Sequence, residues 1–119
     1  MSKTIKAEMW DKMQYLFRNY YDRMVHATLT FDGLLDADAL KNVLVIMCEK
    51  APVIHSSFHE NPVNPYWKVE PYTVNDILTI KDSDDPEKEA YDFLCQSIPV
   101  SSNVQFKVIV LNKDGKSTF

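Results

Sequence analysis

Glycine is scarce in this sequence, with two glycines among 119 residues. Phosphate-binding loops such as G-x-G-x-x-G and Walker A need several glycines, because the backbone must approach the phosphate closely. The composition therefore excludes these nucleotide-binding motifs. The two cysteines, Cys48 and Cys95, fall in helical patterns and form no C-x-x-C pair. This usage predicts a protein of the reducing cytosol, in which each thiol packs as a small apolar group.

Long apolar runs and basic clusters are also missing. No run approaches the roughly 18 apolar residues that a membrane span needs, and the charged N-terminus does not read as a signal peptide. The net charge of -4, without a Lys/Arg cluster, argues against nucleic-acid binding. We therefore expect a cytoplasmic protein with no nucleic-acid or membrane partner.

What is present is a chain of ordinary globular composition, 45% hydrophobic and 25% charged. Apolar periodicity predicts helices at residues 5–21, 36–50 and 86–97. It predicts strands at residues 26–31, 53–58, 66–70, 77–80 and 104–111. Asp36 and Asp85 are expected N-caps, and Pro86 suits a first helical position. The order predicts a single α/β or α+β domain over residues 1–119, with helices flanking a mixed β-sheet.

Two of these helices carry wide apolar faces. In the first helix, Trp10 and Tyr21 widen the face, and we interpret it as core or as an interface between subdomains. The residues on that face are Met9, Met13, Leu16, Phe17 and Tyr20. The second helix is apolar nearly all round, so we expect it to be largely buried. Its apolar residues are Leu40, Val43, Leu44, Val45, Ile46, Met47 and Cys48.

The C-terminal residues predict a β-hairpin. Residues 104–111 are apolar on both faces, which is typical of a central strand, and residues 112–115 end in Asp-Gly, a strong turn signal. A second strand begins at Lys116 and reaches only Phe119. We expect the hairpin to be cut in its second strand, which leaves an unpaired edge at 104–111 that favours self-association or a disordered stub.

Residues 29–40, Leu-Thr-Phe-Asp-Gly-Leu-Leu-Asp-Ala-Asp-Ala-Leu, resemble the strand, G-x-L-D turn and helix start of condensation-type acyltransferases. This superfamily includes nonribosomal peptide synthetase condensation domains, alcohol acetyltransferases and chloramphenicol-acetyltransferase-like enzymes. Residues 66–69, 85–96 and 106–111 resemble later elements of the family in order. The resemblance spans about residues 9–119 and implies the N-terminal half-domain of the CoA-dependent acyltransferase fold.

The chain departs from the family pattern after its second helix. Lys50, Ala51 and His55 stand where the best-marked peptide-synthetase type has Arg, His and Arg. The family's H-H-x-x-x-D-G motif, whose second His serves as general base or positions the nucleophile, is absent. The resemblance places it just beyond Phe119, so no catalytic residue and no cofactor-binding residue is assigned here.

The resemblance implies that the intact protein transfers an acyl group from a thioester to a hydroxyl or amine. The thioester would be carried by coenzyme A or by a phosphopantetheine arm of a carrier protein. On this hypothesis the chain is an N-terminal scaffold fragment that is inactive alone, and its partner is the C-terminal half of the acyltransferase. The alternative hypothesis is a non-catalytic interaction domain that holds a partner with the apolar face of residues 9–21.

Other groups that could carry chemistry have simpler interpretations. His55, His59 and Glu60 have H-x-x-x-H spacing but lie in a loop or strand, so no metal site is predicted. His26 lacks a nominated Ser or Cys partner, and Cys95 has acidic neighbours that disfavour a reactive thiolate. The acidic run 82–85 reads as a solvated loop with a helix cap. The aromatic residues that could line an acyl tunnel or pack in the core are Tyr66, Trp67 and Tyr72.

Overall fold

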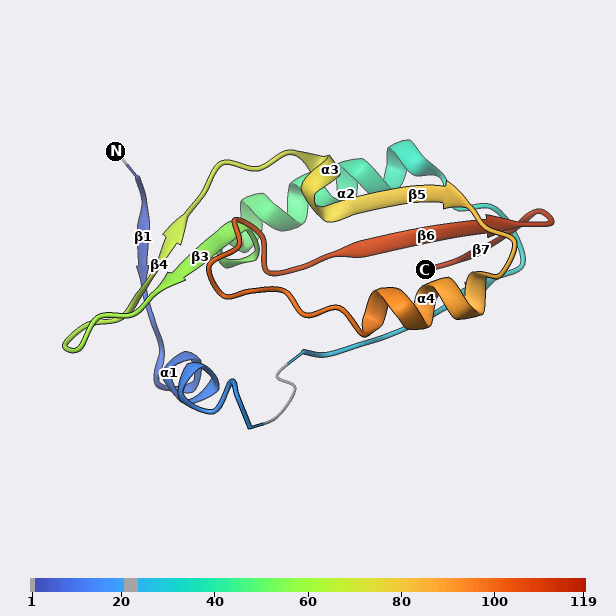
Figure 1. Cartoon of the computed structure of the whole chain (residues 1–119). Coiled ribbons are helices and arrows are strands. Elements are labelled where there is room, and N and C mark those ends of the chain that lie inside the picture. Colours follow the sequence, from blue (N-terminus) through green and yellow to red (C-terminus); the bar gives the residue numbers. More distant parts are fainter. Residues whose placement is uncertain (1, 21–23) are drawn as a thin grey trace.

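The computed structural model describes residues 2–20 and 24–119, which form an α+β fold (Figure 1). Its helices are α1 (Met9–Leu16), α2 (Ala37–Lys50), α3 (Val74–Ile77) and α4 (Pro86–Leu94), with a 3-10 turn η1 (Pro52–His55). Its strands are β1 (Thr4–Lys6), β2 (Thr30–Phe31), β3 (Ser56–His59), β4 (Tyr66–Val69), β5 (Leu78–Asp82), β6 (Val108–Lys113) and β7 (Lys116–Thr118).

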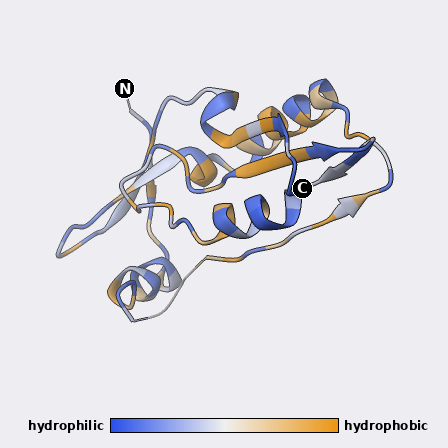
Figure 2. Ribbon diagram, turned by 45° about the vertical axis from the view of Figure 1, so that its right-hand side comes forward, coloured by the Kyte–Doolittle hydropathy of each residue, from blue (hydrophilic) through white to orange (hydrophobic). Residues whose placement is uncertain are grey.

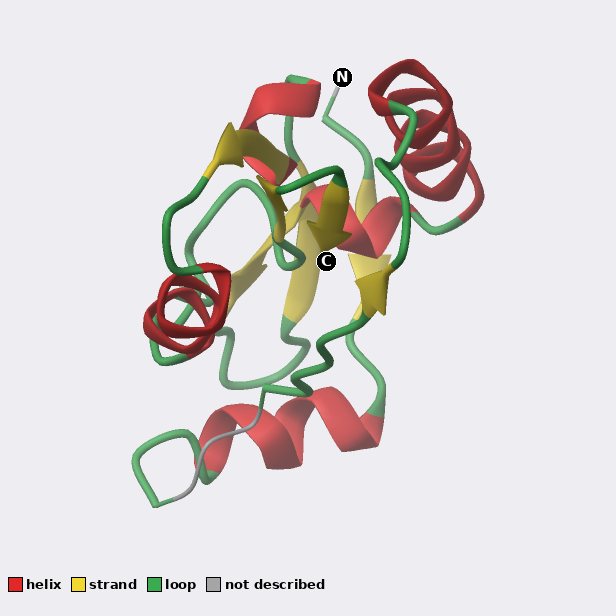
Figure 3. Ribbon diagram, turned by 90° about the vertical axis from the view of Figure 1, so that its right-hand side faces the viewer, coloured by secondary structure: helices red, strands yellow, loops and turns green. Residues whose placement is uncertain are grey.

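The strands divide between two sheets, where one mixed sheet was expected. The small sheet has the order β1-β4-β3 and is antiparallel throughout. The large sheet has the order β2-β7-β6-β5, in which β5 and β6 are parallel and the other pairs antiparallel. The predicted α+β class is confirmed, and Figure 3 shows helices on both sides of the strands.

The large sheet owes its connectivity to local signals in the sequence. Asp36 caps α2, because its carboxylate accepts from the N–H groups of Asp38 (2.9 Å) and Ala39 (3.0 Å). Asp85 caps α4, with Pro86 at the first turn. Both predicted caps are confirmed. Helix α4 lies in the connection between the parallel strands β5 and β6. A tight turn can join antiparallel strands but not parallel ones, so this pair needs a longer crossover connection.

The predicted hairpin is confirmed, with shifted boundaries. Asn112 and Lys113 belong to β6, and Lys113 pairs with Lys116 across a two-residue turn. Asp114 (φ 50°) and Gly115 (φ 74°) both have positive φ, as a type I′ turn requires. The turn that matches the right-handed twist of the strands is therefore supplied by Asp-Gly.

The expected unpaired edge at residues 104–111 is confirmed in part. Strand β6 pairs with β5 over residues 108–112 but with β7 only over residues 111–113, so residues 108–110 have no strand partner on the β7 side in the described part of the chain. Residues 104–107 are irregular because β5 begins only opposite Val108, and the N–H of Gln105 bonds instead to the carbonyl of Ile54 (2.7 Å). The described C-terminus is ordered, since Leu29 and Phe119 exchange two backbone hydrogen bonds of 2.7 Å.

Two separate apolar clusters hold the fold. The larger cluster joins α2 to the large sheet, and β6 is its main hydrophobic strand (Figure 2). Its buried members are Leu44, Cys48, Ile77, Leu78, Val104, Val108 and Val110. The smaller cluster holds the small sheet and comprises Ala7, Phe58 and Trp67. The radius of gyration, 16.1 Å, exceeds the about 13–14 Å of a compact domain of this length.

Helix α2 is less buried than predicted. Leu44 and Cys48 are 3% and 1% exposed, but Val43 and Ile46 are 50% and 54% exposed. One stripe of the helix packs on the large sheet, and no other described element covers the opposite stripe. The all-round apolar pattern therefore gives a half-buried helix.

Helix α1 is shorter than the predicted helix over residues 5–21, and its apolar face is not core. Residues 4–6 form β1, which pairs with β4, while Tyr21 lies outside the described residues. Tyr15 attaches the helix: its ring lies 4.8 Å from that of Phe58, and its hydroxyl donates to Glu60 (2.8 Å). That hydrogen bond is the main reason why the pKa of Tyr15 is raised.

Candidate functional site

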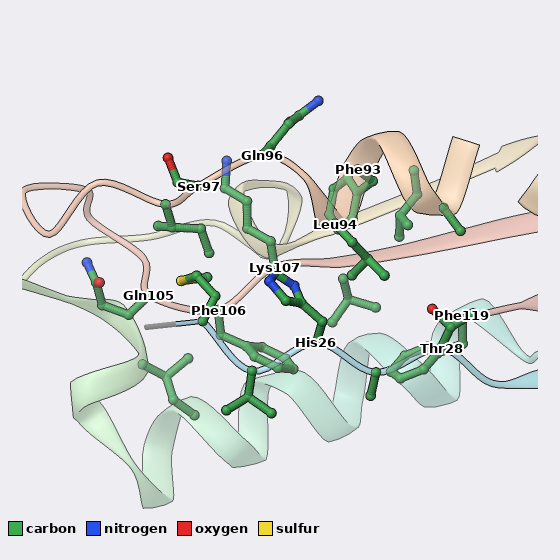
Figure 4. Close-up of a pocket in the computed structure, with 18 of the residues that line it drawn as sticks. His26, Thr28, Phe93, Leu94, Gln96, Ser97, Gln105, Phe106, Lys107 and Phe119 are labelled. Atoms are coloured by element: carbon green, nitrogen blue, oxygen red, sulfur yellow. The ribbon is translucent and has the colours of Figure 1, made fainter. Parts of the chain in front are cut away.

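An apolar cavity of about 600 Å³ lies at the end of β7, between the segment 24–28, the start of β6 and helix α4 (Figure 4). Its size falls in the range of about 300–1,000 Å³ that is usual for ligand pockets. Phe119, the residue after β7, is among the residues that line the cavity. The cavity therefore adjoins the C-terminal end of the hairpin.

The cavity walls come from elements on both faces of the large sheet. Ala90 and Leu94 line it from α4, whereas Val53 and Ile54 line it from η1, which follows α2. Figure 4 shows α4 on one side of the cavity and α2 on the other. The cavity thus passes through the plane of the sheet, between residues 24–28 and residues 105–109.

A few polar side chains lie at the lining. His26, Ser97 and Lys107 line the cavity together with Gln105. The side-chain amide of Gln105 donates to the carbonyl oxygens of Val100 (3.3 Å) and Ser102 (3.1 Å). These hydrogen bonds hold the loop that follows α4. An apolar cavity with few polar groups suits a ligand whose recognised part is a hydrocarbon chain or an apolar peptide.

The structure brings together only part of the predicted aromatic group. Trp67 is 9% exposed and lines the cavity, and its buried indole N–H has no hydrogen-bond partner in the described part of the chain. Tyr66 instead stacks on His59 with ring centroids 5.2 Å apart, and Tyr72 packs on His55 at 4.5 Å. The tunnel-lining interpretation therefore applies to Trp67 alone.

His26, set aside in the sequence for want of a partner, does line the cavity (Figure 4). Its position in an alternating strand pattern gave no sign of this, because the opposite wall is formed by residues about 80 positions away in the chain. Ser97 and Lys107 were missed for the same reason. Only the tertiary arrangement places these three residues around one space.

A second polar cluster, also missed in the sequence, lies on the small sheet. The Ser57 hydroxyl lies 2.7 Å from a Glu70 carboxylate oxygen and 3.0 Å from Nε2 of His59. A carboxylate can only accept, so Ser57 donates to Glu70, and Nε2–H of His59 donates to the Ser57 oxygen. This order is the reverse of a nucleophile–base pair, in which the serine proton goes to histidine.

The same cluster stabilises a charged carboxylate. Donation from Ser57, followed in size by that from Lys68 (3.2 Å), lowers the pKa of Glu70. Ser57 is 4% exposed and does not line the cavity. The cluster is therefore a structural cross-strand network of the small sheet.

The remaining candidates also have structural roles. Nδ1 of His55 donates to the carbonyl of Glu70 (2.8 Å), so His55 and His59 belong to different hydrogen-bond networks. Across residues 2–20 and 24–119, no three His, Cys, Asp or Glu side chains are grouped to hold a metal ion. Cys48 is buried and Cys95 is exposed, and both are unbridged thiols.

The acidic run forms the loop that starts α4. Ser83 donates to Glu89 (2.9 Å), Lys81 forms an ion pair with the same carboxylate, and Lys113 donates to the carbonyl of Asp84 (2.6 Å). Hydrogen bonding from Lys81, and then from Ser83, lowers the pKa of Glu89. The loop with its cap is therefore built from hydrogen bonds within the chain.

Comparison with protein-family models, with curated proteins and with solved structures finds no significant match. None of the helices in the described residues is both long and apolar enough to cross a membrane.

Proposed function

We propose that this chain is the N-terminal scaffold of a condensation-type acyltransferase. The intact enzyme would transfer an acyl group from a coenzyme A or carrier-protein thioester to a hydroxyl or amine. The apolar cavity at the end of β7 is the observation that carries the proposal. In the family that the sequence resembles, the strand after this hairpin leads to the catalytic histidine motif, and the cavity lies at that point.

The neighbourhood of the cavity supports the same assignment. The turn of residues 32–36, which resembles the family's G-x-L-D turn, is joined to the hairpin because the N–H of Leu35 donates to the Ser117 hydroxyl (3.0 Å). Strand β2 pairs with β7 on the same side. The G-x-L-D-like segment is therefore adjacent to the second strand of the C-terminal hairpin, and β7 separates it from residues 108–111 of β6.

In this proposal the chain contributes a wall and not the acid–base group. Phe93 and Leu94 offer an apolar surface for an acyl chain, whose burial contributes about 0.8 kcal/mol per methylene. The reaction itself needs a base that takes the proton from the attacking hydroxyl or amine while the thioester carbon–sulfur bond breaks. That base is assigned to the C-terminal half of the acyltransferase, the partner of this chain.

The test is calorimetric titration of the purified chain with octanoyl-coenzyme A. We expect saturable binding that Ser97→Phe weakens by roughly tenfold, because an aromatic ring at the cavity wall displaces about two methylenes. Ser101→Phe is the matched control, since Ser101 is exposed and does not line this cavity. Failure to bind, or equal binding by both variants, would refute the tunnel-wall role.

A catalytic assay tests the division of labour. Incubated with octanoyl-coenzyme A and a primary alcohol or amine, the chain alone should give no acyl transfer above the uncatalysed rate. Transfer well above that rate would place the catalytic group within these residues and overturn the scaffold assignment.

A second candidate function is that of an interaction domain, and the exposed face of α1 favours it. Met9, Trp10 and Leu16 are 76%, 66% and 64% exposed, and Tyr20 beyond the helix is 82% exposed. Contiguous apolar patches of this kind mark sites of association. Under this alternative, octanoyl-coenzyme A does not bind, and Trp10→Ser with Leu16→Ser abolishes association with a partner.

A further inference from the structure

A second, smaller cavity lies between helix α1 and the small sheet, at the end of the molecule that carries α1 (Figure 1). Its volume is about 260 Å³. Ligand pockets usually have volumes of about 300–1,000 Å³, so this cavity suits a small ligand or one end of a larger one. Val25 and Trp67 also line the larger cavity, which makes the two cavities neighbours.

Helix α1 turns polar side chains toward this cavity and apolar ones away from it. Asp11 and Gln14 line the cavity and are half-buried, whereas Met9 and Leu16 on the outer side are 76% and 64% exposed. An amphipathic helix usually has the opposite orientation, with its apolar stripe against the protein. The orientation of α1 therefore brings a carboxylate beside the apolar face of the small sheet.

Aromatic rings form much of the remaining lining. Phe58 and Trp67 of the small sheet meet at 70° with their centroids 5.1 Å apart, and Trp10 lines the cavity from α1. The face of an aromatic ring carries negative potential, which attracts cations. One such pair already exists at this end of the molecule, because the guanidinium carbon of Arg18 lies 3.9 Å from the ring centroid of Tyr15.

The charge of the lining also favours a cation. Asp11 is fixed in place, since its carboxylate accepts from the N–H of Glu8 (2.8 Å). None of the described residues that line this cavity is basic. A primary ammonium group needs a hydrogen-bond acceptor for each of its three N–H groups, which aromatic walls do not supply. A fully methylated ammonium group has no N–H, so aromatic walls with one carboxylate suit it better.

We propose that this cavity binds the trimethylammonium group of a small organic cation such as choline. The methyl groups pack against Trp10, Phe58 and Trp67, and the carboxylate of Asp11 balances the positive charge. This binding requires neither acyl transfer nor a protein docked on the outer face of α1. It therefore goes beyond both functions proposed above.

The test is titration of the ¹⁵N-labelled chain with choline, followed by NMR. Trp10 and Trp67 are the two tryptophans of the sequence, and both line the cavity, so their indole N–H signals report on it directly. We expect both signals to shift along one saturable curve. The neutral alcohol in which carbon replaces the choline nitrogen should bind roughly tenfold more weakly, because it lacks the charge. Unmoved indole signals, or equal affinity for the neutral alcohol, would overturn the proposal.

Two variants and one matched control test the lining. Asp11→Asn removes the charge but keeps an oxygen that accepts from Glu8, and Trp10→Leu removes an aromatic wall at a position that is 66% exposed. Each should weaken choline binding by roughly fivefold. Tyr91→Leu removes a ring that is 69% exposed on α4 and does not line the cavity, so it should leave binding unchanged. Unchanged binding in both cavity variants, or an equal loss in Tyr91→Leu, contradicts the assigned site.

Two further titrations separate this proposal from its neighbours. A trimethyllysine side chain carries the same group, so blocked trimethyllysine is a second probe; if it binds more tightly than choline, the site belongs to a methylated protein and the small cation is overturned. Ser97→Phe alters the larger cavity alone of the two and should leave choline binding unchanged. Loss of choline binding in Ser97→Phe would overturn a separate site.

Discussion

Replacing Ser117 by alanine tests whether the turn after β2 and the C-terminal hairpin form one unit. Ser117 is fully buried, at 0% exposure. Its hydroxyl accepts from the N–H of Leu35 (3.0 Å) and donates to the side-chain oxygen of Asn112 (2.6 Å). One hydroxyl thus connects two segments that lie 82 residues apart.

The magnitude follows from what the substitution leaves behind. Ser117→Ala removes one oxygen atom, creates little empty volume and leaves one donor and one acceptor without their partner. An unsatisfied buried polar group costs about 1–3 kcal/mol, and both partners here are only partly buried. We expect the free energy of unfolding to fall by about 2 kcal/mol, which lowers Tm by about 8 °C in a domain of this size.

The assay is urea denaturation followed by far-ultraviolet circular dichroism, with a double-mutant cycle. Asn112→Ala and the double variant measure the coupling between Ser117 and Asn112, expected at about 1 kcal/mol. Ser101→Ala, at an exposed position, should change stability by no more than about 0.5 kcal/mol. A loss below that value for Ser117→Ala, or coupling indistinguishable from zero, would refute the idea that this hydroxyl joins the two segments.

Three further outcomes are expected. Asp36→Ala should destabilise the chain by about 1 kcal/mol in urea titration, since it removes the N-cap of α2; an unchanged midpoint would contradict this. Gly115→Val should cost about 1–2 kcal/mol, because a β-branched residue must adopt φ 74° in the turn; equal stability would show that the turn rearranges. The lowered pKa of Glu70 means that its stabilising effect is present above its ordinary pKa of 4.5 and is lost as pH falls through the folded value. Ser57→Ala should raise the pKa of Glu70 toward 4.5 in an NMR titration, and an unmoved pKa would contradict the assigned donor.

The features that could be predicted from the sequence are those with local causes. Asp85 followed by Pro86 specifies a helix start within a few residues, and Asp114-Gly115 specifies a hairpin turn by its backbone conformation. These signals depend on neighbours in the chain, so one sequence suffices to identify them. The α+β class follows from the order of such elements.

The features that could not be predicted depend on distant partners. Residues 4–6 form a strand only because residues 66–68 lie beside them, and this pairing overrides the helical pattern that begins at residue 5. Residues 104–107 look like strand by composition but lack neighbours on both sides. The cavity lining was hidden for the same reason, because His26 and Lys107 meet at one space only in three dimensions.

The separation of the two apolar clusters has a consequence for local unfolding. Seven buried residues hold the large sheet, and three hold the small one. Since opening free energy grows with the apolar area that becomes exposed, β1, β3 and β4 should open more often than β5 and β6. The end of the molecule that carries α1 can therefore loosen while β5 and β6 of the large sheet stay paired.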